Sequence, residues 1–307
     1  MLRFITLGCA AGGGYPQWNC NCVGCRAARA APDTHEGQAG IAASVDGEHW
    51  FLINASPDIR AQINATPALH PRAGRLRDTP IAGVILTNGE IDAVTGLLSL
   101  REGSPFAIHA HPRVLSVLAE NPIFDVLDRA RVPRHAIALD TPFEPALPDG
   151  TPSGLIVEAF EVPGKPAWHL EGRAEPTEER PGDTLGLRLR AATGGPEAFV
   201  IAACGRVTEA LRDRLRGAAL VMFDGTLWHD DELIDQGLAA KTGRRMGHVS
   251  VSGPEGAMAR LEGLGIARKL FVHVNNSNPI LRPGTPERAA IEAAGWRLPR
   301  AGEEIAP

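Results

Sequence analysis

The chain has 307 residues, of which 44% are hydrophobic and 22% are charged, a composition typical of globular proteins. A net charge of -5 argues against nucleic acid or an anionic membrane as a partner. The N-terminal residues lack the apolar stretch of a signal peptide, and no apolar run approaches the roughly 20 residues that span a bilayer. We therefore expect a cytoplasmic protein.

The first part of the chain predicts an alternation of strands and helices. Apolar, β-branched runs predict strands at residues 2–8, at 81–87 and at the start of 105–121. Residues 39–56 are expected to form a hairpin that turns at Asp46-Gly47. Helices are predicted at residues 25–31, 57–65 and 92–102 and at the end of 105–121. Ser56 is the expected N-terminal cap of the second of these helices, and Asp92 of the third.

The second half predicts further buried strands that end in polar side chains. Strands are expected at residues 198–205, 218–226 and 268–276, a helix at 252–264, and strands with long loops across 140–200. Asp224 and His273 follow two of these apolar runs, as Asn54, Asp58, Glu90 and Asp92 do in the first half. Ligands bind at the carboxyl ends of strands in layered α/β folds, so we expect these side chains to converge on one site.

Three of the five cysteines lie within six residues, as Cys20, Cys22 and Cys25 in the pattern C-x-C-x-x-C. In a cytosolic chain, clustered thiols indicate a metal site rather than disulfides. A structural Zn²⁺ would hold three thiolates and would stabilise the glycine-rich loop at about residues 11–25. The alternative is a loop with three reduced thiols. The fourth ligand stays open among three polar residues that follow strands, His273, Asn276 and Asp58.

Glu90 and Asp92 follow directly after a predicted buried strand, which is an unusual position for two carboxylates. Without a cation between them they would repel each other, which raises their pKa or recruits a metal. The alternative for Asp92 is a simple helix cap. Other side chains that can bind metal are expected to pack instead, namely Cys9, Cys204, His109 and His111.

Six segments carry a resemblance to a known family: GCAAGGGYPQWNCNCVGC, LINASPDIRAQI, LTNGEIDAVTGLLSLREG, MFDGTLWHDDE, TGRRMGH and FVHVNNSNPIL. Together they closely resemble the pyrroloquinoline quinone (PQQ) biosynthesis protein B family of the metallo-β-lactamase superfamily. The resemblance spans nearly the whole chain and is weakest at about 140–200. It implies a single domain over residues 1–307 with an α/β fold, a four-layer αββα sandwich that has its metal site along one edge.

The resemblance also implies a set of metal ligands. The superfamily motif H-x-H-x-D-H falls on Asn88, Glu90, Asp92 and Ala93, whereas the family has a histidine where this chain has Ala93. Later ligands map onto Asp224 and His273, and a catalytic histidine of related phosphodiesterases maps onto His248, as a proton shuttle. Glu90, Asp92, Asp224 and His273 would then hold the active-site metal. This oxygen-rich set favours Mn²⁺, Fe²⁺ or Mg²⁺ over a hydrolytic di-zinc centre. We expect Fe²⁺ at the active site, with Mn²⁺ or Zn²⁺ as the alternatives.

The family implies a role in PQQ biosynthesis, in which an Fe²⁺ centre uses O₂ to hydroxylate the tyrosine-derived ring of a Glu–Tyr cross-linked precursor. Candidate residues for binding this small quinone precursor are Arg60 and Arg101 by charge and Asn275 and Asn278 by hydrogen bonds; surface salt bridges are the alternative for the arginines. A carrier of PQQ or its precursor without catalysis is the alternative function, which Ala93 favours. Hydrolysis at a di-metal site would need imidazoles that this edge lacks. Other enzymes of the pathway and a second copy of the chain are candidate partners.

Overall fold

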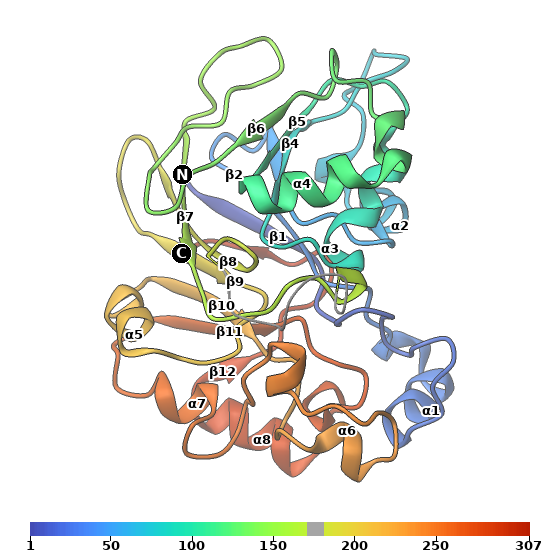
Figure 1. Cartoon of the computed structure of the whole chain (residues 1–307), viewed down its shortest axis with the longest axis vertical. Helices are drawn as coiled ribbons and strands as arrows, with labels where there is room; N and C mark the ends of the chain where they lie inside the picture. The colour runs from blue at the N-terminus through green and yellow to red at the C-terminus, as the bar shows by residue number, and fades with distance from the viewer. Residues whose placement is uncertain (171–180) are drawn as a thin grey trace.

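Apolar runs that are buried on both faces form two β-sheets, which pack face to face at the centre of the molecule (Figure 1). The computed structural model describes residues 1–170 and 181–307. The first sheet has the strand order β13-β1-β2-β3-β4-β5-β6, and the second has the order β12-β11-β10-β9-β8-β7. In Figure 1 helices α2–α4 accompany the first sheet in the upper half, and α5–α8 lie beside the second sheet in the lower half.

The elements have the following bounds. The strands are β1 (Arg3–Gly8), β2 (Gly40–Ser44), β3 (Trp50–Ile53), β4 (Ile81–Leu86), β5 (Ala107–Ala110), β6 (Arg134–Ala136), β7 (Leu155–Glu161), β8 (Leu185–Ala191), β9 (Ala198–Ile201), β10 (Leu220–Asp224), β11 (Arg268–Val272), β12 (Trp296–Arg297) and β13 (Glu304–Ile305). The α-helices are α1 (Val23–Ala30), α2 (Ile59–Ala65), α3 (Ile91–Val94), α4 (Pro112–Glu120), α5 (Glu209–Leu215), α6 (Glu232–Asp235), α7 (Ala257–Arg260) and α8 (Pro286–Ala293). The 3-10 helices are η1 (Pro32–Thr34), η2 (Pro67–Leu69), η3 (Thr95–Leu100), η4 (Pro122–Val126), η5 (Trp168–Leu170), η6 (Arg244–Met246) and η7 (Pro279–Leu281). Within the described ranges, none of these helices has the length and apolar character needed to cross a membrane.

Three hydrophobic clusters fill the interfaces between the layers. One, with Phe51, Val157 and Met222 among its members, lies between the two sheets. Another contains Ile59 and Leu118 and joins the first sheet to α2 and α4, while the third joins the second sheet to α5, α7 and α8. Three interfaces between four layers are what an αββα sandwich requires. The predicted fold is therefore confirmed.

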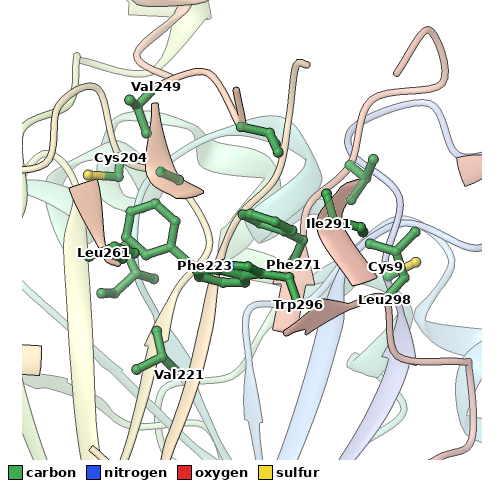
Figure 2. Packing of buried hydrophobic residues seen from close by; sticks show 14 of the residues in the cluster. Cys9, Cys204, Val221, Phe223, Val249, Leu261, Phe271, Ile291, Trp296 and Leu298 are labelled. Carbon is green, nitrogen blue, oxygen red and sulfur yellow. The ribbon is translucent and has the colours of Figure 1, made fainter. Parts of the chain in front are cut away.

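Figure 2 shows the cluster beneath the second sheet, where aromatic rings pack closely. The rings of Phe271 and Trp296 stack with centroids 4.1 Å apart, and Phe223 meets Trp296 edge-on at 6.5 Å. Cys9 and Cys204 belong to the same cluster and are at most 1% exposed. Their expected role as small buried side chains is confirmed.

Parallel pairing brings the strand ends of interest to the same edge. Strands β3 and β4 are parallel neighbours in one sheet, and β10 and β11 are parallel neighbours in the other. Within each sheet the residues that follow these strands therefore leave at the same edge, and the contact of His273 with Asp92 at 3.0 Å brings the two edges together. This is the arrangement that the polar residues after the apolar runs predicted.

Two predicted helices differ from the observed ones. Helix α2 begins at Ile59 with Asp58 at its N-cap, so the predicted cap at Ser56 is wrong; the Ser56 hydroxyl accepts from the Asp58 N–H. The predicted helix 92–102 is α3 followed by η3, with Glu90 at the N-cap. The α-helix gives way to a 3-10 helix here because the Gly96 N–H donates to the Ala55 carbonyl instead of to a carbonyl of its own helix. Only glycine fits at position 96, since a Cβ there would clash with a backbone oxygen of Ser56. Asp92 consequently does not cap this helix.

His109 and His111 pack as expected. The His109 ring, 5% exposed, stacks on His135 and Phe143, and its Nε2 has no hydrogen-bond partner among residues 1–170 and 181–307. His111 sits at the N-cap of α4, where its Nδ1 accepts from the Arg113 N–H at 3.4 Å. Burial, followed by the charge of His135, lowers the pKa of His109 to about 4.

The lowered pKa predicts an acid-sensitive core. The native state keeps His109 neutral, whereas the unfolded chain protonates it below its ordinary pKa of 6.5. The stabilising contribution is therefore complete above pH 6.5 and is lost as the pH falls to about 4, by up to about 3 kcal/mol. We expect His109→Leu to flatten the pH dependence of the free energy of unfolding in this window, as measured by urea denaturation. An unchanged slope would contradict the assignment.

Candidate functional site

A cavity of about 690 Å³ opens at the edge where β4, β10 and β11 end. Its walls come from the glycine-rich loop near the N-terminus, from the residues after β4 and β11, and from the segments around residues 165–168 and 238–248. Eight of the residues singled out in the sequence line this cavity: Cys20, Asn88, Glu90, Asp92, His248, His273, Asn275 and Asn276. Convergence of the strand ends therefore creates a concave site with ionisable side chains in its wall.

Asp224, at the end of β10, is fully buried next to this cavity and accepts four hydrogen bonds. One oxygen accepts from the Cys204 N–H at 2.8 Å and faces His248 Nδ1 at 2.7 Å. The other accepts from the N–H and the hydroxyl of Thr226, at 3.0 and 2.6 Å. Since a buried carboxylate needs such compensation, Asp224 is held as a rigid anion that orients His248 and Thr226.

His273 follows β11 in a left-handed backbone conformation, with φ 56°. Non-glycine residues rarely adopt this conformation, and strain of this kind often marks a functional site. Its Nε2 lies 3.0 Å from Asp92 Oδ2. Burial alone would lower the pKa of His273, but the hydrogen bond and the charge of Asp92, with Asp224 and Glu90, raise it. A lone pair facing a carboxylate needs a proton or a metal ion between the two atoms.

Thr226 is the residue that sequence reasoning missed. Its Oγ1 lies 3.0 Å from His248 Nδ1 and 2.8 Å from His273 Nδ1, and it donates to Asp224. The two imidazole rings stack with centroids 5.1 Å apart. The signal available in the sequence was a hydroxyl two residues after the acid at the strand end, in the segment FDGT. Thr226 therefore positions both imidazoles.

The side chains at this edge form a group that can hold a metal ion. Asp224, His248 and His273 each offer a ligand atom, and these atoms lie within 4.8 Å of one another. Asp92 adds a carboxylate through its contact with His273. Imidazole nitrogens together with carboxylate oxygens suit Fe²⁺ and similar divalent transition metals. The residues present therefore fit a divalent transition metal.

The sulfurs of Cys20, Cys22 and Cys25 form a second group with ligand atoms within 4.8 Å of one another. The Cys22 N–H donates to Cys20 Sγ, and the Cys25 N–H donates to Cys22 Sγ, both at 3.4 Å. Burial raises the pKa of Cys22, but the bond from the Cys25 N–H and hydrogen bonds with the side chains of Cys20, Cys25 and Asn276 lower it overall. Burial, with the neighbouring Cys22 thiolate, raises the pKa of Cys25 to about 11. A cation would relieve this repulsion, so the cluster fits Zn²⁺.

Asn276 has the best position of the three candidates for the fourth zinc ligand. Its carboxamide lies 3.1, 3.7 and 3.3 Å from the sulfurs of Cys20, Cys22 and Cys25. A 180° rotation of the carboxamide would exchange its nitrogen and oxygen, and would place the oxygen, which can bind a metal, beside the three sulfurs. Gly24 permits the approach, since a Cβ there would lie 2.8 Å from the Asn276 carbonyl. The other two candidates are engaged elsewhere, His273 with Asp92 and Asp58 with Gln38.

Known proteins resemble this chain over its full length. The family model described as Beta-lactamase superfamily domain matches residues 49–274. A Coenzyme PQQ synthesis protein B from Bradyrhizobium diazoefficiens is 60% identical over 307 residues, which cover 99% of both chains. The protein of the same name from Gluconacetobacter diazotrophicus is 54% identical over 310 residues, with the same coverage. The crystal structure of Zn(2+)-bound PqqB from Methylobacterium extorquens superposes with a TM-score of 0.93 at 45% identity, over 99% of this chain and 100% of that one.

The chain belongs to the PQQ synthesis protein B family. Membership in the family places it within the β-lactamase superfamily. A diphosphatase of the PhnP family superposes with a TM-score of 0.67 at 17% identity, over 100% of this chain and 98% of that one, and this likeness shows the shared fold alone.

Two positions of the superfamily motif depart from a ligand role here. The Glu90 carboxylate accepts from Lys165 Nζ at 3.0 Å and from the Trp168 N–H at 3.0 and 3.1 Å. Within the described part of the chain, Glu90 belongs to neither group of ligand atoms, so its predicted role as a metal ligand lacks geometric support. Ala93 is 3% exposed and packs in the hydrophobic cluster under α3. Of the motif positions, only Asp92 therefore stays a candidate metal ligand.

The residues predicted to bind substrate fall into two groups. Asn275 lines the cavity and donates to the Ser277 hydroxyl. Asn278 is 1% exposed and donates to the Gly225 carbonyl, a structural contact. Arg60 and Arg101 are exposed, and neither is among the described residues that line the cavity; Arg101 pairs with Glu102. This cavity therefore offers no support for substrate binding by the two arginines or by Asn278.

Proposed function

We propose that this chain acts in PQQ biosynthesis and hydroxylates the tyrosine-derived ring of the Glu–Tyr cross-linked precursor with O₂ at an Fe²⁺ centre. The observation that carries this proposal is the meeting of Asp92, Asp224, His248 and His273 at one cavity. Family membership supports the pathway. The donor set supports iron. A hydrolytic di-zinc centre needs more nitrogen ligands than this edge has, whereas carboxylates combined with an imidazole suit Fe²⁺.

Each residue then has a defined task. Asp92, Asp224 and His273 would hold the metal, and iron bound there would supply the redox chemistry with O₂. Thr226 holds the His273 ring in place through Nδ1. His248 is oriented by Asp224 through Nδ1, which leaves Nε2 as the nitrogen that exchanges a proton with a molecule in the cavity. Zn²⁺ in the cysteine cluster would fix the loop that forms one wall, and the crystal structure of the Methylobacterium relative is of a Zn(2+)-bound protein.

The test is direct. Protein loaded anaerobically with Fe²⁺ is mixed with the cross-linked diamino acid, O₂ and ascorbate, and the product is analysed by mass spectrometry for one added oxygen atom. We expect product formation by this chain and at least about tenfold slower turnover by His273→Ala, because the imidazole that faces Asp92 is a proposed metal ligand. Iron affinity should fall in parallel. Absence of the hydroxylated product from the parent chain would overturn the proposal.

A second function has one observation in its favour. Ala93 removes an imidazole that the family resemblance implies, and Glu90 is engaged away from the ligand group. A chain with a weakened metal edge and a cavity of about 690 Å³ is suited to carry PQQ or its precursor. Tight quinone binding by the metal-free protein without turnover would support this carrier. Stoichiometric iron with turnover would exclude it.

A further inference from the structure

The carboxylate of Glu90 sits in a receptor built from a distant part of the chain. Lys165 Nζ reaches one oxygen at 3.0 Å, and the Trp168 N–H points at both oxygens, at 3.0 and 3.1 Å. Both donors belong to the segment between β7 and β8, where η5 begins at Trp168. An ammonium group with a peptide N–H is a general receptor for a carboxylate.

The receptor belongs to the cavity wall. Glu90, Lys165 and Trp168 all line the cavity, and the side chains of Lys165 and Glu90 are 16% and 27% exposed. The ion pair is therefore partly desolvated, which strengthens it relative to a surface pair but keeps it open to competition from solutes. An anion that enters the cavity reaches the same donors.

The surroundings suit an aromatic carboxylate. The Trp168 ring is 69% exposed, and Lys241 Nζ lies 5.7 Å from the ring centroid. Lys241 lines the cavity as well, so the wall combines an aromatic face with two cationic side chains. A large exposed ring at a cavity wall commonly serves as a stacking surface for a ligand.

We propose that Lys165 and the Trp168 N–H form a subsite for a carboxylate of the substrate, and that Glu90 is an internal carboxylate which the substrate displaces. This inference rests on the proposed function only in that the ligand is an aromatic carboxylate. Lys165 is thus a specificity-determining residue, and Glu90 is its competitor rather than a metal ligand. The step is an exchange of one carboxylate for another, so the charge at Lys165 stays balanced.

The two members of the pair should have opposite effects on binding, which separates this role from a structural one. The probe is PQQ, an aromatic tricarboxylate, titrated by isothermal calorimetry into purified protein that keeps zinc in the cysteine cluster. Lys165→Met should weaken PQQ binding about 10- to 100-fold, because a charge-assisted hydrogen bond is lost. Glu90→Gln should tighten binding about 3- to 10-fold, because the competing anion is removed.

Lys269→Met is the matched control, since the Lys269 ammonium also lies over a tryptophan ring, that of Trp296, but Lys269 is not among the described residues that line the cavity. It should leave PQQ affinity within about twofold of the parent, whereas a structural pair would make both Lys165→Met and Glu90→Gln weaken binding. Such shifts of equal sign, or no binding of PQQ to the parent chain, overturn the inference. The titration needs no turnover, so opposite shifts together with a negative hydroxylation assay would retain the subsite and reject the enzymatic function.

Discussion

Replacing Cys22 by serine is expected to release zinc from the cysteine cluster and to destabilise the wall of the cavity. A structural zinc site contributes about 10–16 kcal/mol of binding free energy in small zinc-dependent domains. Loss of one thiolate should forfeit roughly a third of this, about 4 kcal/mol, which corresponds to about a thousandfold weaker binding. Asn276, which lies against Gly24, would lose its carboxamide contact with the Cys22 sulfur. Elemental analysis and thermal denaturation measure the two effects.

Cys9→Ser is the matched control for this experiment. Cys9 is also buried, at 1% exposed, but it lies in the hydrophobic cluster beneath the second sheet and belongs to neither ligand group. It should lower stability by about 1–3 kcal/mol through burial of a hydroxyl group, with zinc content unchanged. A Cys22→Ser protein that retains full zinc and melts with the control would contradict a zinc site in this loop.

Asp224→Asn is expected to have the largest effect on the active-site metal. The carboxylate accepts four hydrogen bonds, and an amide in its place turns one oxygen into a donor that faces other donors. Both the negative charge and the orientation of His248 are lost. We expect iron binding at the edge to fall at least about a hundredfold, and stability to fall by about 1–3 kcal/mol for the unsatisfied buried groups. Zinc in the cysteine cluster should remain, so elemental analysis distinguishes the two sites.

Asp58→Asn provides the comparison for the loss of an acid after a strand. Asp58 also accepts a backbone N–H, that of Gln38 at 2.9 Å, but it does not line the cavity within the described residues. This variant should keep its iron and lose only modest stability. If both variants lose iron equally, the effect of Asp224→Asn comes from general destabilisation rather than from a lost ligand.

Much of the architecture follows from local patterns in the chain. The apolar runs that end in polar residues are strands β3, β4, β10 and β11, and parallel pairing carries their ends to one edge within each sheet. The cysteine cluster could be recognised because its three thiols lie within six residues. Helix ends were less well predicted, since the boundary at Gly96 depends on a contact with Ala55, forty-one positions away in the chain.

The partner of each polar side chain, by contrast, depends on long-range packing. Glu90 and Asp92 are two residues apart, yet Asp92 meets His273 whereas Glu90 meets Lys165, which lies 75 positions downstream. Asn276 reaches Cys20 across 256 positions. Periodicity and capping residues report which face a side chain occupies, because they reflect the backbone over one or two turns. They carry no information on which distant segment covers that face, and so the cavity, its carboxylate receptor and the role of Thr226 emerged only when the two sheets had packed.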